Sequence, residues 1–227
     1  MDPTLSLWSP PPARLALASD QLHLWRFRLD LPAAAVNELS PLLSSDEQNR
    51  AARLLDRSKA EQFIVARARM RQILGRYLKR KPEELTFAYG EQGKPHLVEP
   101  SAQELIFNLS HTGSWGVLAI TAGKEVGVDI EQIDRQLKPE QVAAGFFSAQ
   151  ELEQLQKYRP ARRRRGFYRI WTRKEACLKG EGSGFSAPKN SPDKAKWQTR
   201  SFVVAQDYLG TVACPEEVTV IDRWTFI

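Results

Sequence analysis

The segment 171–179 is the strongest local signal in the chain, because it contains good helix formers and neither glycine nor proline. Three glycines between residues 180 and 184 follow it, which is typical of the end of a helix. On a helix, Trp171 and Glu175 lie along one side, and Glu175 and Lys179 are adjacent because they are one turn apart. An exposed ion pair, worth about 0.3–0.5 kcal/mol, is the simplest explanation of these two charges on their own.

A second segment, 126–131, alternates apolar and acidic residues with a period of two. This pattern predicts a strand on which Val128 and Ile130 point one way while Asp129 and Glu131 point the other. A half-buried strand with a solvated polar face gives the same pattern. However, two like charges on one face, closer than a Debye length, repel each other unless water or a cation separates them.

Taken together, the two segments predict a metal site. Asp129 and Glu131 from the strand, with Glu175 from the helix, would supply three hard oxygen ligands. Mg²⁺ favours such ligands and leaves its remaining positions to water or to substrate phosphates. The ammonium group of Lys179 would suit a phosphate bound to that metal.

The two segments, separated by some forty residues, resemble the signature of the Sfp-type 4′-phosphopantetheinyl transferases. The length of 227 residues corresponds to the larger branch of that family. No position that the family uses for metal binding or catalysis departs from its pattern. The matching motifs are, in order, Gly93-Lys94-Pro95, Phe107-Asn108-Leu109-Ser110-His111-Thr112-Gly113, Gly127-Val128-Asp129-Ile130-Glu131, and Trp171 with Lys174, Glu175, Ala176 and Lys179.

The resemblance implies that the protein transfers the 4′-phosphopantetheine arm of coenzyme A to a serine hydroxyl of an apo carrier protein. The product would be a holo carrier protein of fatty acid, polyketide or nonribosomal peptide biosynthesis, with adenosine 3′,5′-bisphosphate released. This is a Mg²⁺-dependent phosphoryl transfer, in which positioning and charge neutralisation supply most of the catalysis. Glu175, or a water molecule on the metal, would take the serine proton, and Lys179 would neutralise the leaving group.

Contacts to coenzyme A are likewise implied by the resemblance. Lys94 would contact the adenosine end, while Ser110 and His111 would contact the phosphate groups. Basic residues of the segment 50–76 would approach the nucleotide phosphates, although a solvated flank of the helix expected over 59–78 explains them too. The candidates in that segment are Arg50, Arg67 and Arg71.

The order of strand and helix patterns predicts an α+β fold, and the order strand, helix, strands recurs on both sides of residue 123. The resemblance implies two similar halves, each a small, mainly antiparallel sheet packed with helices, related by a pseudo-two-fold axis. We expect an irregular lead-in at 1–20, an N-terminal half at 21–122 with the nucleotide contacts, and a C-terminal half at 123–227 with the metal site. The arginines at 162–165 are expected before the signature helix, either as a solvated basic turn or as an interaction patch for an acidic partner.

Composition indicates a globular protein, with 42% hydrophobic and 26% charged residues. No apolar run reaches the roughly eighteen residues of a membrane span, and no signal peptide is recognisable. Two distant cysteines, Cys177 and Cys214, predict reduced thiols in a cytoplasm, although one disulfide is compatible with them. The family resemblance implies a monomer.

The net charge of +6 favours anionic partners, which include nucleic acid, acidic proteins and phosphorylated cofactors. A nucleic-acid-binding module built on arginines 162–165 is the competing class. The chain lacks zinc-finger spacing and any recognisable RNA-binding motif, and three co-localised acids would repel phosphates without a metal. A family member without turnover is disfavoured by the intact Asp129, Glu175 and Lys179. We therefore expect an enzyme whose basic surface receives an acidic apo carrier protein.

Overall fold

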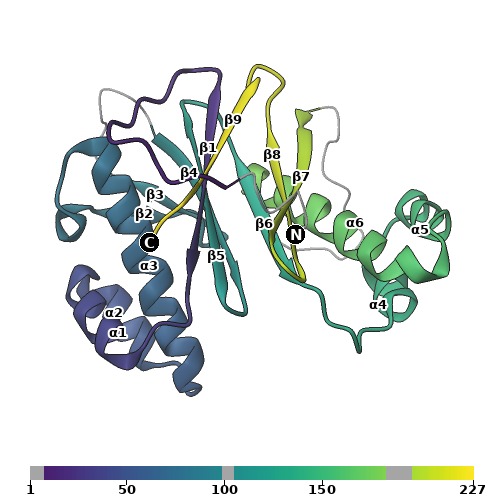
Figure 1. Ribbon diagram of the computed structural model, residues 1–227, viewed down its shortest axis with the longest axis horizontal. Helices are drawn as coiled ribbons and strands as arrows, with labels where there is room; N and C mark the ends of the chain where they lie inside the picture. Colours follow the sequence, from purple (N-terminus) through teal and green to yellow (C-terminus); the bar gives the residue numbers. More distant parts are fainter. Residues whose placement is uncertain (1–7, 99–104, 183–195) are drawn as a thin grey trace.

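The computed structural model describes residues 8–98, 105–182 and 196–227, so that the start of the expected lead-in lies outside the described residues. Helices enclose two layers of sheet (Figure 1). The strands are β1 Gln21–Arg28, β2 Phe87–Tyr89, β3 Pro95–Leu97, β4 Leu105–Thr112, β5 Trp115–Ala122, β6 Gly127–Gln132, β7 Gln198–Ala205, β8 Tyr208–Cys214 and β9 Val220–Thr225. The helices are α1 Ala33–Leu39, α2 Ser45–Ala52, α3 Arg57–Leu78, α4 Pro139–Phe146, α5 Ala149–Gln156 and α6 Pro160–Glu181, with short 3₁₀ helices at Ser40–Leu42 and Pro82–Glu84.

Two sheets form the middle layers. The first has the strand order β4-β5-β1-β9, in which β9 runs parallel to β1 and the other pairs are antiparallel. The second has the order β6-β8-β7 and is antiparallel throughout. A small antiparallel pair, β2-β3, stands beside them. The α+β fold with two mainly antiparallel sheets and packed helices is therefore confirmed.

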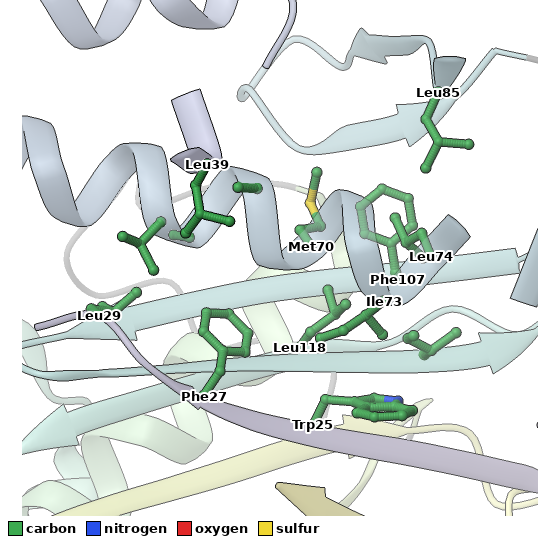
Figure 2. Close-up of a cluster of buried hydrophobic side chains, with 14 of the residues drawn as sticks. Trp25, Phe27, Leu29, Leu39, Met70, Ile73, Leu74, Leu85, Phe107 and Leu118 are labelled. Atoms are coloured by element: carbon green, nitrogen blue, oxygen red, sulfur yellow. The ribbon is translucent and has the colours of Figure 1, made fainter. Parts of the chain in front are cut away.

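The first sheet is buried on both faces. Successive side chains of a strand point to opposite sides, and those of β1 lie in two different hydrophobic cores. On β1, Trp25 and Phe27 face the helical layer, whereas Leu24 faces the second sheet. Figure 2 shows Trp25 and Phe27 beneath Met70 and Ile73 of α3. The helices α1 to α3 therefore cover one face of this sheet, and the second sheet covers the other.

The second sheet lies between the first sheet and α6 (Figure 1). Val128 and Ile130 of β6 are buried in the core between the two sheets. Since β6 alternates, Asp129 points to the opposite face, where α6 packs on β6 and β8. The predicted strand is thus confirmed, and it presents its acidic side to the signature helix.

Each of the two predicted halves contributes a segment to the other. Strand β9, from the end of the chain, pairs with β1 in the first sheet. Conversely, Trp8 precedes β1 but packs in the core between the sheets, where its indole N–H donates a hydrogen bond to the carbonyl of Val203 at 2.8 Å. The division of the chain at residues 122 and 123 stays a prediction, and these two crossings show that such halves would be interlocked.

Helix α6 is longer than the segment 171–179 alone indicates. It begins at Pro160, a residue favoured at the first position of a helix, and ends at Gly182, which has a left-handed φ of 68°. The prediction of a basic turn at 162–165 is therefore wrong, because these arginines lie in the first turns of α6. Among the described residues, no helix is long and apolar enough to cross a membrane.

Candidate active site

Two side chains of β4 bond to the edge of β6 that does not pair with β8. The backbone N–H of Val128 donates to Asn108 Oδ1 at 2.8 Å, and that of Ile130 donates to Ser110 Oγ at 3.2 Å. Because β6 is the edge strand of the second sheet, these side chains satisfy N–H groups that no strand in the described parts pairs. Asn108 and Ser110 therefore fix the position of Asp129, which lies between the two bonded residues.

Asp129 is almost fully buried, at 4% exposure, and is the centre of a polar cluster. Its Oδ1 accepts hydrogen bonds from Lys179 Nζ at 2.6 Å and from Ser110 Oγ at 3.2 Å. Lys179 Nζ also donates to Ser110 Oγ at 3.1 Å, so that β4, β6 and α6 meet at one point. Burial raises the pKa of the Asp129 carboxyl above its ordinary value, and the nearby Lys179 ammonium opposes that shift.

Glu131 and Glu175 lie close enough to Asp129 for its charge to act on both. Burial, and then the negative charge of Asp129, raises the pKa of each glutamate to about 7. Glu131 accepts a hydrogen bond from the side chain of Trp171, which lies one turn before Glu175 on α6. The mutual repulsion expected between the predicted carboxylates is therefore present in the folded protein.

The carboxylates have the chemistry of a Mg²⁺ site, and one observation of the structure supports that use. Asp129 Oδ2 is buried without a hydrogen-bond partner among the described residues, an arrangement that costs free energy unless a further ligand supplies one. In the present arrangement, no three His, Cys, Asp or Glu side chains of the described segments are grouped closely enough to hold a metal ion. The oxygen donors are of the type that a hard cation prefers, but they would have to move closer together to hold one, and Lys179 Nζ is the cation that touches Asp129 here.

Lys94 links the β2-β3 pair to the start of β6 and to the end of α6. Its Nζ donates to Glu125 Oε2 at 2.9 Å and to the carbonyl of Gly180 at 3.3 Å. The preceding Gly93 has a φ of 77°, a conformation that favours glycine and turns the chain here. Lys94 therefore lies between the start of β6 and the end of α6, and it lines a cavity of about 450 Å³ together with His96 and other residues of this region.

Comparison with known proteins shows which family the chain belongs to. A family model described as 4′-phosphopantetheinyl transferase superfamily matches residues 125–216, and another, described as 4′-phosphopantetheinyl transferase, N-terminal, matches residues 33–123. The 4′-phosphopantetheinyl transferase HetI of Nostoc sp. (strain PCC 7120) is 37% identical over 180 residues, which cover 79% of this chain and 76% of HetI. The chain belongs to the 4′-phosphopantetheinyl transferase family.

Two further relatives agree. A putative 4′-phosphopantetheinyl transferase, slr0495, of Synechocystis sp. (strain PCC 6803) is 35% identical over 182 residues, covering 78% of this chain and 73% of the relative. The 4′-phosphopantetheinyl transferase Sfp of Bacillus subtilis (strain 168) is 28% identical over 151 residues, covering 66% and 64%. The predicted family and enzyme class are confirmed, and with them the transfer of phosphopantetheine from coenzyme A to an apo carrier protein.

His111 and Arg50, which are predicted to contact coenzyme A, differ in their surroundings. His111 ends the buried part of β4 and keeps access to solvent. Desolvation of its ring and the positive charge of Lys179 lower the pKa of His111 below its ordinary value. Arg50 is exposed on α2, with its guanidinium over the ring of Phe63. Both side chains have room to meet an anionic ligand.

Arg67 and Arg71 do not lie on a solvated flank, and that expectation is wrong. Both guanidiniums form ion pairs with Glu47 of α2, at 2.5 and 2.7 Å, and all three side chains are buried. Arg71 also donates to the carbonyl of Leu85 at 2.8 Å, and Arg67 donates to the hydroxyl of Tyr89 at 2.8 Å. Because these donors already bond to other residues of the protein, neither guanidinium is available to bind a nucleotide phosphate in this arrangement.

Sequence reasoning missed two residues that position the site, Asn108 and Gly127. Asn108 stands two residues before Ser110, so the period of a strand would have placed it on the same face. Gly127 was part of a recognised motif, but its role depends on packing. A Cβ atom there would lie 1.9 Å from the carbonyl oxygen of Ala176 and 2.4 Å from the amide nitrogen of Gly180. Only glycine lets β6 approach α6 this closely.

We expect Gly127→Ala to destabilise the transferase by about 3 kcal/mol, because both obstructing atoms belong to the backbone and cannot rotate away. Urea unfolding followed by circular dichroism measures this loss. The control is Gly145→Ala in α4, where an added Cβ meets nothing within 4 Å and stability should be unchanged or slightly higher. Equal stability of the two variants would contradict the close approach of β6 and α6.

Proposed function

We propose that Asp129, Glu131, Glu175 and Lys179 form the catalytic centre of this transferase. The observation that carries the proposal is the meeting of Ser110, Asp129 and Lys179 from three separate elements, where Asp129 Oδ1 accepts from both other side chains and the buried Oδ2 has no hydrogen-bond partner among the described residues. Such a concentration of charge is costly for a fold and is typical of a functional site.

Asp129, Glu131 and Glu175 would hold Mg²⁺ together with the pyrophosphate of coenzyme A. When bound, the ion would supply positive charge that offsets the repulsion between the pyrophosphate and the incoming serine oxygen. Lys179 neutralises the negative charge that develops on the departing adenosine bisphosphate, because its ammonium lies beside Asp129 at the end of α6. A bond from the serine oxygen to the β-phosphorus forms as the bond from that phosphorus to the leaving group breaks.

Glu175 accepts the proton of the carrier serine in this proposal. It lies on α6 one turn before Lys179, so the base and the cation that meets the leaving group are carried by one rigid helix. A carboxylate is a weak base for a hydroxyl, and the proton therefore moves as the bond to phosphorus forms.

Lys94, Ser110, His111 and Arg50 would contact coenzyme A. The cavity of about 450 Å³ beside Lys94 supports this assignment, since its size is in the range of small-molecule sites and it begins at Gly180, one residue beyond Lys179. The adenosine end would occupy the cavity, with Ser110 and His111 nearer to the phosphates. Contacts from Arg67 and Arg71 would require both to leave Glu47, so we assign them to the fold instead.

The partner would be an acidic apo carrier protein. Arg162 and Arg165 are exposed at the start of α6, and Arg163 is paired with Glu140. This positive surface supports an association that weakens as salt is added. We further propose a monomer in the cytoplasm, where the buried Cys177 and Cys214, which form no disulfide, would remain reduced.

Intact-mass spectrometry tests the reaction and its dependence on metal. An apo acyl carrier protein incubated with this transferase, coenzyme A and Mg²⁺ is expected to gain about 340 Da, the mass of phosphopantetheine, and the gain should disappear with excess EDTA and return with added Mg²⁺. A gain that persists in EDTA would refute the magnesium proposal while leaving the transfer established. No gain on several acyl and peptidyl carriers, with a folded enzyme that binds coenzyme A, would indicate a member without turnover.

A further inference from the structure

A second cavity, of about 210 Å³, lies behind the catalytic helix. It is bounded by α5, by α6 and by the start of β7, and it includes Arg173 and Cys177 of α6. These two residues are one turn apart and each precedes Glu175 or Lys179 by two positions, which places them about 200° around the helix. The cavity therefore shares α6 with the catalytic centre but opens on its opposite side.

The charges around this cavity do not cancel. Lys174 donates to Glu151 Oε2 at 3.2 Å and to the carbonyl of Phe146 at 2.7 Å, and both charged side chains are buried. This pair is neutral as a unit. Arg173 adds a guanidinium whose Nε is buried and has no hydrogen-bond partner among the residues that the structure describes. The guanidinium of Arg173 therefore leaves one positive charge in excess among the residues that line the cavity.

The rest of the wall combines three apolar residues with the polar Gln154 and Thr199. Ile170 and Cys177 are buried, and the ring of Trp197 is 6% exposed. The indole N–H of Trp197 is directed to Glu181 Oε1, at 3.4 Å, so the ring itself is what the residue offers to the cavity. The volume of the cavity is below the roughly 300–1,000 Å³ of pockets for drug-sized ligands, so the cavity can take only smaller molecules.

We propose that this cavity is a binding site for a small monocarboxylate with a flat apolar body, of the size of benzoate. The carboxylate would pair with the Arg173 guanidinium and the body would lie against Trp197 and Ile170. The chemistry follows from the wall: Lys174 and Glu151 neutralise each other, which leaves the Arg173 guanidinium as the charge in excess, with Trp197 and Ile170 as the apolar part. The site is independent of the transfer reaction proposed above, since it includes none of the residues assigned to catalysis.

Isothermal titration and ligand-observed NMR with benzoate, on the full chain, test the proposal. We expect saturable one-to-one binding, and at least about tenfold weaker binding of the uncharged benzamide, because the charge-assisted hydrogen bond is lost. Arg173→Gln should weaken benzoate by about tenfold or more, whereas Arg173→Lys should restore part of the affinity. Arg169→Gln, an exposed arginine of the same helix outside the cavity, makes the same change of net charge and should leave binding within about twofold.

Three outcomes would overturn the proposal. Absence of binding at millimolar benzoate would mean that the cavity holds only water. Equal loss of affinity in the Arg173 and Arg169 variants would indicate non-specific attraction to a basic protein. Equal affinity for benzamide and benzoate would show that the Arg173 guanidinium has no part in recognition. Thermal unfolding of each variant, measured alongside, separates loss of binding from loss of the fold.

Discussion

Glu175→Gln is expected to lower the rate constant of phosphopantetheine transfer by about 10²–10³-fold with little change in stability. The substitution keeps the size of the side chain but removes its ability to accept the serine proton and to bind a cation as a carboxylate. Removal of the negative charge also relieves repulsion with Asp129 and Glu131, so the folded protein should lose nothing. Single-turnover mass spectrometry of a carrier protein measures the rate directly.

The matched control for this substitution is Glu153→Gln. Glu153 is an exposed residue of α5 whose carboxylate pairs with Lys157 on the surface, and its loss should leave the rate within about twofold. If Glu175→Gln retained the rate of the unsubstituted enzyme at saturating Mg²⁺, the assignment of Glu175 to proton transfer and metal binding would be wrong. A loss of rate with unchanged binding of coenzyme A would place the defect in the chemical step.

Glu47→Gln is expected to destabilise the protein by about 3–5 kcal/mol. Glu47 is 2% exposed and is the counterion of both Arg67 and Arg71, so the substitution leaves two buried guanidiniums without a neutralising charge. Glu47 also closes the capping box of α2 through the backbone N–H of Ser44, a contact that glutamine can retain. The expected loss is therefore electrostatic, and chemical denaturation at neutral pH measures it.

Glu61→Gln on α3 is the control for this effect. Glu61 pairs with Arg57 at the surface, at 2.8 Å, and its loss should cost less than about 0.5 kcal/mol. The pH dependence gives a second check. The arginines lower the pKa of Glu47 below its usual 4.5, so its stabilisation is present above that pH and is lost as the pH falls further. A Glu47→Gln protein as stable as the Glu61→Gln protein would contradict a structural role for the buried group.

The centre of the site was predictable because it follows from local periodicity. The period of two placed Asp129 on the face of β6 opposite to Val128 and Ile130, and the structure has these two in the core between the sheets. The spacing of four placed Glu175 and Lys179 on one side of α6. What the sequence could not supply was the partner of each charge: Lys179 bonds to Asp129 and Ser110 in this structure.

Long-range pairing explains the errors. Arg67 and Arg71 have the spacing of a surface stripe on α3, and their counterion, Glu47, belongs to a different helix. The spacing of residues within one helix does not indicate which residue of another helix they contact. The misplacement of arginines 162–165 is different, since Pro160 is a usual first residue of a helix and could have been recognised as the start of α6.

The pairing of β9 with β1 has a consequence for the order in which the chain can fold during synthesis. Thr225 lies beside Arg26, so the first sheet lacks its edge strand until β9, which follows β1 to β8 in the chain, has left the ribosome. Until then, the free edge of β1 is open to wrong pairing with other chains. A fragment covering 21–122 would keep that open edge permanently. The first sheet is therefore completed by a late pairing between segments that are far apart in the sequence, a kind of contact that forms slowly.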